Sequence, residues 1–169
     1  LEVTTPSLKP NHPLITSAKN LLSEYDYFDK EMPFSIWISG TNGKTTTTQM
    51  LTHLLSKRGA LSGGNIGTPL AELDTNAPIW VLESSSFALH HTHTASPDIY
   101  LLLPITPDHL DWHETPEAYE ADKLRPLLTM KEGELALVPK GLNLPKTNAY
   151  VVEYDSNEFV EAYFNLDST

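Results

Sequence analysis

Cysteine is absent from the 169 residues of this chain, which excludes a disulfide framework and a thiolate metal site. That absence suits a reducing compartment, and we expect a cytoplasmic protein. Basic residues are also scarce, because 11 lysines and arginines stand against 22 acidic residues, giving a formal net charge of −11. Nucleic acids and anionic membranes repel such a charge, so the sequence predicts neither of them as a partner.

Long apolar runs are missing as well. No window reaches the length of a membrane span, and the first ten residues, LEVTTPSLKP, lack the basic start and apolar centre of a signal peptide. The composition, with 40% hydrophobic and 20% charged residues, is that of a globular protein, and the length fits one domain. Because the chain starts at Leu1 within a proline-containing stretch, we expect a piece of a longer protein.

The first 33 residues differ from the remainder. Residues 1–13 contain three prolines, which favours an extended segment, and Asn11 with Pro13 can start a helix through about Leu22. We therefore predict that residues 1–33 are a linker and packing helix from a preceding domain. Residues 34–169 are predicted to be a separate, incomplete domain.

That second part alternates apolar runs with helical patterns. The run FSIWIS at 34–39 ends in a glycine-containing loop, and TTTTQMLTHLLSKRG at 45–59 then has apolar residues at helical spacing. A longer helix is predicted from Thr115, a capping residue followed by Pro116, to Met130. Buried strands between helices predict an α/β fold of the P-loop nucleotide-binding type, a mostly parallel sheet with helices on both faces. The further predicted strands are IWVLE at 79–83, IYLLL at 99–103, ELALV at 134–138 and YVVEY at 150–154.

The segment SGTNGKTTTT, residues 39–48, lies between the first strand and its helix. In such a loop the backbone N–H groups face phosphate oxygens, Lys44 reaches the β- and γ-phosphates, and the Thr45 hydroxyl can bind magnesium. The first glycine of the general P-loop pattern would fall at Ile38, whereas this chain has Gly40, which indicates a shorter variant. The alternative is a capped glycine turn with an exposed lysine, but the flanking strand and helix favour phosphate binding.

Polar residues follow two other strands. Glu83 ends the run IWVLE, and Asp108, His109 and Asp111 follow IYLLL in the segment PITPDHLDWH. Since carboxyl ends of parallel strands meet at one edge of the sheet, these groups are predicted near the phosphate loop, where they can bind a divalent metal. Each has a plainer interpretation, a helix cap for Glu83 and a capped turn for the other segment.

Three histidines, at positions 90, 91 and 93, follow the segment ESSSFAL. They lie in a helical pattern with no carboxylate nearby in sequence, so we interpret them as a partly exposed helix end rather than a metal site. Trp37 and Trp80 lie inside apolar strands and are predicted to belong to the core.

Four ordered motifs resemble the Mur ligases and the related folylpolyglutamate synthetases. They are TNGKTTT at 41–47, GGNIGTPL at 63–70, ESSSFALH at 83–90, and TPDHLDWH with ADKLR at 106–113 and 121–125. The resemblance covers about Thr5 to Gly141. The second and third motifs are most similar to those of the members that add D-glutamate to UDP-N-acetylmuramoyl-L-alanine. Pro104, where many members have asparagine, and Ser84, where leucine is frequent, depart from the family pattern.

The resemblance implies a role for each matching residue. It assigns catalysis to Lys44, His109 and Lys123, and it assigns ATP binding to Gly40, Thr41, Asn42, Gly43, Lys44, Thr45 and Thr46. It implies Mg²⁺ binding by Thr45, Glu83, His109 and Lys123, the last as a carbamate. It also implies substrate binding by Asn65, Ser84 and Ser85.

The implied reaction is an ATP-dependent amide ligation through an acyl phosphate, in the synthesis of peptidoglycan precursors. UDP-N-acetylmuramoyl-L-alanine and D-glutamate are the implied substrates, and ATP and Mg²⁺ the implied cofactors. The family's later His-Asn motif, its UDP-binding domain and its amino-acid-binding domain are not in these 169 residues, so we expect the chain to be inactive alone. Another Mur ligase, a folylpolyglutamate synthetase-like ligase, a nucleotide-binding module without catalysis and a metal-free phosphate-binding domain remain alternatives.

Overall fold

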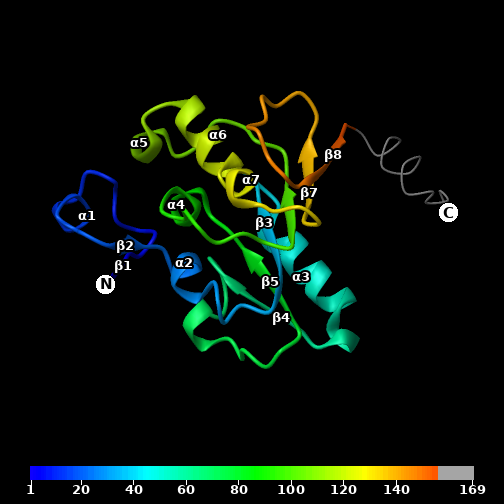
Figure 1. Cartoon of the computed structure of the whole chain (residues 1–169). Helices are drawn as coiled ribbons and strands as arrows, with labels where there is room; N and C mark the ends of the chain where they lie inside the picture. The colour runs from blue at the N-terminus through cyan, green and yellow to red at the C-terminus, as the bar shows by residue number, and fades with distance from the viewer. Residues whose placement is uncertain (156–169) are drawn as a thin grey trace.

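A computed structural model describes residues 1–155 (Figure 1). Six strands form one parallel sheet in the order β4-β5-β3-β6-β7-β8, which confirms the predicted fold class. The predicted domain extends to residue 169, and residues 156–169 lie outside the described part. No helix within residues 1–155 is long and apolar enough to cross a membrane. The strands are β3 (Phe34–Ser39), β4 (Ala60–Gly64), β5 (Ile79–Glu83), β6 (Ile99–Leu102), β7 (Leu135–Pro139) and β8 (Tyr150–Tyr154).

Both faces of the sheet are covered by helices, because its strands carry apolar residues on both sides. On one face, Trp37, Leu82 and Tyr100 are fully buried in the main core. On the other face, Ile38 and Val81 form a smaller cluster against the helix α3 (Lys44–Leu54). Figure 1 shows α3 alone on its side of the sheet. The helices that contribute to the main core are α2 (Glu24–Phe28), α4 (Ser86–His90), α6 (Pro116–Leu124) and α7 (Pro126–Thr129).

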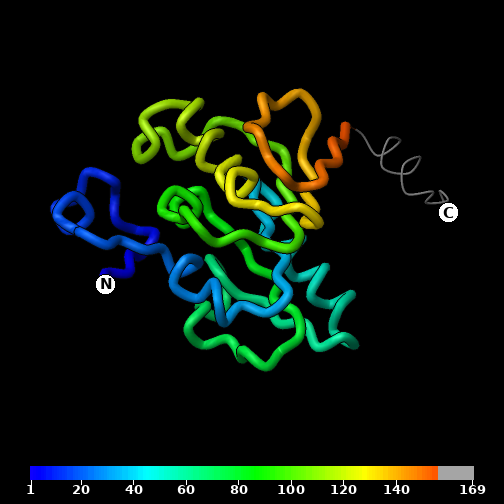
Figure 2. The backbone as a smooth tube through the Cα atoms, in the orientation of Figure 1, coloured from blue at the N-terminus to red at the C-terminus, as the bar shows by residue number. Residues whose placement is uncertain are grey.

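The helix expected from Pro13 to about Leu22 is wrong in its extent. The helix α1 covers only Pro13–Thr16, and β2 (Leu21–Leu22) then pairs in parallel with β1 (Glu2–Val3). A four-residue helix with no buried residue has no packing to extend it, and the Glu2 carboxylate accepts from the Asn20 N–H where the strand pair begins. Figure 2 shows this N-terminal segment as a blue arm beside the main body.

The predicted helix from Thr115 to Met130 is two helices. Thr115 caps α6 as predicted, since its hydroxyl accepts from the Ala118 N–H at 3.1 Å. Pro126 has no N–H to donate to residue 122, so α6 ends at Leu124 and α7 begins at Pro126. The break leaves Asp122 and Lys123 in the last turn of α6.

Three further differences concern the regular elements. The strand β4 was not predicted, because its sequence ALSGG has no apolar run. The predicted helix 45–59 starts one residue earlier, at Lys44, and ends at Leu54, after which Ser56–Arg58 forms a 3₁₀ turn. Strand β6 ends one residue early and β7 is shifted by one. The remaining elements are α5 (Leu110–His113) and the 3₁₀ turn Leu70–Glu72.

Candidate functional site

Four strands deliver their following residues to one edge of the sheet. Strand β3 lies between β5 and β6, and β4 lies beyond β5, all in parallel. The register pairs Ile38 with Glu83 and Gly64 with Glu83, so the ends of β3, β4 and β5 are level. Ligand-binding groups of open parallel sheets gather at this edge, and most of the predicted site residues lie there.

The loop after β3 turns directly into α3. Gly40 and Gly43 have φ angles of +138° and +84°, and Lys44 is the first helical residue. A side chain at Gly40 would place its Cβ 2.5 Å from that of Leu103, so only glycine fits. The N–H groups of the first turn of α3 have no helical acceptor, and with the positive end of the helix dipole they form an anion-binding geometry.

Two groups fasten this loop. The Thr41 hydroxyl donates to the carbonyl of Thr106 at 2.9 Å, and the Thr41 N–H donates to the carbonyl of Pro104 at 3.2 Å. Lys44 folds back over the loop, where its Nζ donates to the carbonyls of Gly40 at 3.0 Å and Thr41 at 2.8 Å. A phosphate anion on the loop would offer Lys44 a charged partner instead of these neutral carbonyls.

Glu83 connects the loop with the end of β4. Its Oε2 accepts from the Thr45 hydroxyl at 2.8 Å, and its Oε1 accepts from Asn65 Nδ2 at 3.1 Å. The Glu83 residue is only 2% exposed. The buried Glu83 carboxylate and the Thr45 hydroxyl beside it are oxygen ligands of the kind that Mg²⁺ prefers.

Lys123 reaches the same loop from α6. Its Nζ donates to the carbonyl of Gly40 at 2.8 Å and lies 4.7 Å from the centre of the Tyr119 ring. The residue is 1% exposed, so this lysine is buried and is not a solvated surface charge. Burial, together with repulsion from Lys44, lowers the pKa of Lys123 to about 7. A large fraction of its amine is therefore neutral near neutral pH.

The polar residues of the segment after β6 lie in two different places. His109 has a left-handed backbone, with φ +53°, and lines the cavity at the site. Its Nε2 lies 3.6 Å from Oδ2 of Asp108. Asp111 points elsewhere: its side chain is 84% exposed and lies 4.0 Å from the Lys9 ammonium. The structure thus brings His109, with Asp108 as its neighbour, to the predicted position and places Asp111 outside it.

The three serines after Glu83 point in different directions. The Ser84 hydroxyl is fully buried and shares a 2.9 Å hydrogen bond with the Tyr25 hydroxyl, away from the cavity. Ser85 caps α4 by accepting from the Ala88 N–H. The site cavity, of about 80 Å³, has Asn65 and Ser85 in its wall but not Ser84. Its full lining is Lys44, Asn65, Ser85, Ser86, Phe87, His109, Tyr119 and Lys123.

The family described as "Mur ligase middle domain" matches residues 38–165. The chain belongs to the Mur ligase family. A UDP-N-acetylmuramoylalanine–D-glutamate ligase from Campylobacter jejuni strain 81-176 is 54% identical over 168 residues, which are 99% of this chain and 42% of that protein. The ligase of the same name from Helicobacter pylori strain HPAG1 is 53% identical over 82% of this chain and 34% of its own length. The chain therefore spans less than half of the relatives it matches.

Solved Mur ligase structures share the fold. A Neisseria meningitides UDP-N-acetylmuramate:L-alanyl-gamma-D-glutamyl-meso-diaminopimelate ligase superposes with a TM-score of 0.60 at 18% identity, covering 89% of this chain and 57% of its own. The MurF ligase from Thermotoga maritima, in complex with ADP, gives a TM-score of 0.53 at 23% identity, covering 74% and 35%. These similarities support the architecture described above for this Mur ligase domain.

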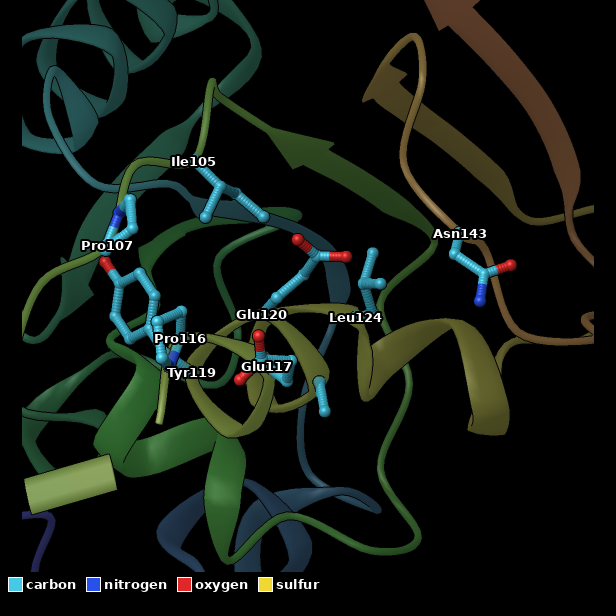
Figure 3. A pocket seen from close by; sticks show the side chains of 9 residues that line it. Ile105, Pro107, Pro116, Glu117, Tyr119, Glu120, Leu124 and Asn143 are labelled. Atoms are coloured by element: carbon cyan, nitrogen blue, oxygen red, sulfur yellow. The ribbon is translucent and has the colours of Figure 1, made fainter. Parts of the chain in front are cut away.

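Sequence reasoning missed Tyr119, a residue between two cavities. Its ring approaches Lys123, and its hydroxyl lies 3.1 Å from the Thr41 hydroxyl, so it touches both the lysine and the loop. The spacing of four residues to Lys123 was the available signal, because it places both side chains on one helix face. On its other side Tyr119 borders an open cavity of about 440 Å³ between α6 and Asn143 of the β7–β8 connection (Figure 3).

The histidines after Ser86 are not alike. His90 ends α4 and is partly exposed, as interpreted from the sequence, but His91 is buried at 5% exposure. Burial and the neighbouring His90 lower the pKa of His91 to about 4, so it is neutral at physiological pH. His90 has a carboxylate partner, Asp122, which is 32 residues away in sequence and could not be recognised there.

Proposed function

We propose that this Mur ligase domain is the ATP-binding core of an enzyme that joins D-glutamate to UDP-N-acetylmuramoyl-L-alanine. One observation carries the proposal: Glu83, Lys44 and Lys123 converge on one phosphate-type loop from three separate elements. Glu83 accepts a hydrogen bond from Thr45, and both lysines donate to the carbonyl of Gly40. The names and the 53–54% identity of the relatives support the choice of substrates.

The residues fit ATP and Mg²⁺ in type and in placement. The loop N–H groups and Lys44 would hold the β- and γ-phosphates, and Thr45 with Glu83 would hold one Mg²⁺. His109, which lines the site cavity, would bind a second Mg²⁺. The metal ions would neutralise charge on the transferring phosphoryl group.

Lys123 suits modification to a carbamate. Only a neutral amine attacks carbon dioxide, and the lowered pKa of Lys123 makes that form abundant near pH 7. The product exchanges a buried cation for an anionic oxygen donor, which the second Mg²⁺ would stabilise. The buried position between Gly40 and Tyr119 makes this residue a better candidate than the exposed lysines of the chain.

The proposed reaction has two steps. The terminal carboxylate of the UDP-sugar substrate attacks the γ-phosphorus of ATP, and ADP leaves with the electrons of the broken P–O bond. The amine of D-glutamate then attacks the acyl carbon, phosphate leaves, and the amine loses a proton. Lys44 counters the charge that develops on the phosphoryl oxygens, so no protein nucleophile is needed.

The decisive experiment uses the full-length protein that contains this chain. Phosphate release from ATP is measured with Mg²⁺ and UDP-N-acetylmuramoyl-L-alanine while the amino acid is varied among D-glutamate, L-glutamate and meso-diaminopimelate. Release that requires D-glutamate supports the proposal. Release with another amino acid would identify a different ligase, and nucleotide binding with no release for any amino acid would favour a module without catalysis.

A further inference from the structure

Three helices meet at the carboxylate of Asp122, outside the residues assigned above. Its Oδ2 accepts from His90 Nδ1 of α4 at 2.8 Å and from His113 Nδ1 of α5 at 3.0 Å. Its Oδ1 accepts from the guanidinium of Arg125 at 2.8 Å. The residue is 3% exposed, so these bonds provide most of what compensates for its loss of water.

The hydrogens of this cluster have one consistent arrangement. Three donors surround Asp122, and one of them is the Arg125 guanidinium, which can only donate, so Asp122 is the acceptor of the cluster. The His113 side chain is fully buried, an environment that favours an uncharged ring, and its Nδ1 is the atom that faces the Asp122 carboxylate. A neutral His113 that donates from Nδ1 has an unprotonated Nε2. That atom lies 3.0 Å from the Ser86 hydroxyl and accepts its hydrogen.

The hydrogen-bonded series Asp122–His113–Ser86 ends at the site cavity. Ser86 lines that cavity together with Lys44 and Lys123. Because its hydrogen is committed to His113, the Ser86 oxygen offers only an acceptor to whatever occupies the cavity. The Phe87 ring lies parallel to the His113 ring, at 9° and 5.5 Å between centres, which fixes the plane of the imidazole.

Asp122, at the other end of this hydrogen-bonded series, is adjacent to Lys123 in sequence. Asp122 faces α4 and α5, whereas Lys123 points to the loop on another side of the same short helix. The Tyr100 hydroxyl of β6 donates to the Lys123 carbonyl, which ties the last turn of α6 to the sheet. Since α6 has only nine residues, rotation at Asp122 would displace the Lys123 amine from Gly40.

We propose that Asp122 and His113 are positioning residues for the reaction, which hold Lys123 against the phosphate loop and orient the Ser86 oxygen as an acceptor into the same cavity. This inference rests on the proposed ligase activity. Neither residue touches the substrates; Asp122 acts through Lys123, and His113 acts through Ser86. Partners that orient metal-binding side chains typically change activity by about 10- to 100-fold when they are removed.

The test compares four forms of the full-length protein: wild type, Asp122→Asn, Ser86→Ala and Glu120→Gln. Glu120 is the matched control, because it lies on the same helix but lines the neighbouring open cavity (Figure 3). The measurements are kcat and KM for each substrate, the carbamate resonance after incubation with ¹³C-bicarbonate, and the unfolding temperature.

We expect Asp122→Asn to lower kcat by about 10- to 100-fold with little change in KM, and to weaken the carbamate resonance. Ser86→Ala should lower kcat while keeping both the carbamate and the unfolding temperature, and Glu120→Gln should match wild type. A merely structural role predicts a lower unfolding temperature with wild-type kcat and carbamate, which would overturn the inference. If Asp122→Asn does not fold, Ser86→Ala decides, and wild-type kcat in that variant overturns the role of His113.

A readout without catalysis separates this inference from the proposed function. Imidazole ¹⁵N spectra of the wild-type protein should show His113 as the neutral tautomer protonated at Nδ1. A ring protonated at Nε2 would overturn the inference whatever the enzyme does. Loss of the proposed function would appear instead as the absence of D-glutamate-dependent phosphate release in the wild type.

Discussion

The Thr45 hydroxyl donates a 2.8 Å hydrogen bond to Oε2 of Glu83, although 38 residues separate the two in sequence. The bond joins the first turn of α3 to the last residue of β5, the strand beside β3. It also shows that Glu83 faces the phosphate loop rather than capping α4, a task that the structure gives to Ser85. The predicted strand-loop-helix arrangement is confirmed, with Lys44 at the start of its helix.

Substitution of Glu83 by glutamine tests the metal assignment. Two donors, from Thr45 and Asn65, aim at this carboxylate, and a glutamine amide can accept with only one of its two heavy atoms. The variant should lose about tenfold or more of the magnesium-dependent ADP affinity, in line with roughly 1.5 kcal/mol or more for one hydrogen bond to a charged group. Calorimetry with ADP, with and without Mg²⁺, measures the effect. Equal magnesium dependence in both proteins would argue against Glu83 as a metal ligand.

The Lys44→Ala variant of the full-length enzyme should lose ligation through lost stabilisation of the transferring phosphoryl group. Removing one such preorganised group typically lowers the rate by about a hundredfold or more. The matched control is Lys57→Ala, an exposed lysine in the 3₁₀ turn after α3. Steady-state kinetics should show the loss in Lys44→Ala alone, and rates within a few-fold of wild type would contradict the role of Lys44.

The lowered pKa of Lys123 predicts how stability depends on pH. The folded pKa is about 7, below the ordinary value of 10.5, so between these values the unfolded chain binds more protons than the native one. The destabilising effect of the buried ammonium is fully present below about pH 7 and is relieved as the pH rises toward 10.5. The free energy of unfolding, measured with denaturant at several pH values, should therefore rise with pH more steeply in wild type than in Lys123→Met. The difference between the two slopes should reach up to about 1.4 kcal/mol per pH unit in this window. Parallel pH profiles would contradict the shift.

An alanine at Gly40 should destabilise the chain more than an alanine at Gly133. Both glycines have positive φ angles, +138° and +92°, and strain of this kind typically costs about 1 to 3 kcal/mol. Only at Gly40 would the new Cβ also meet a neighbour, 2.5 Å from Cβ of Leu103, whereas nothing lies within 4 Å at Gly133. Denaturant unfolding measures the difference, and equal losses would show that the Leu103 side of the loop can move.

The isolated 169-residue chain should have no ligase activity even when it is folded. Holding two reactants in near-attack geometry accounts for roughly 7 to 11 kcal/mol of barrier reduction, and the chain corresponds to only 42% of its Campylobacter jejuni relative. Nucleotide binding can persist, because the loop N–H groups and Lys44 are local. Phosphate release is compared with that of the full-length enzyme under identical conditions. Comparable turnover would show that these residues hold more of the substrate site than we propose.

The sequence was sufficient for the parts of the fold that depend on local pattern. Strands such as IWVLE are continuous apolar runs, and the loop at Gly40 follows from glycines between a strand and a helix. The strand β4 was not predicted, because its sequence ALSGG has no apolar run. Its backbone pairing with β5 makes it a strand, and such pairing leaves no signal in the local sequence. The break at Pro126 was visible in the sequence and was overlooked, since proline removes the N–H that a continuous helix needs.

Only those residues of the candidate site that directly follow a strand could be predicted from the sequence pattern. Glu83 and His109 follow strands, so the common edge of a parallel sheet placed them. The position of Lys123 beside Gly40 depends on how α6 packs, and the link between His113 and Asp122 depends on the angle between two short helices. Such contacts are set by tertiary packing, which no local pattern encodes.

The bond from Lys123 to the Gly40 carbonyl has a thermodynamic consequence. An ammonium that donates to this carbonyl and a carbamate that carries negative charge are mutually exclusive states of one nitrogen. Modification of Lys123 therefore replaces a cationic donor beside the loop with a group that carries one N–H and a negative charge, and any ligand that binds one form more tightly shifts the modification equilibrium by the same factor. On the proposed function, nucleotide binding and carbon dioxide uptake are reciprocal equilibria in this protein, with Gly40 as the shared element.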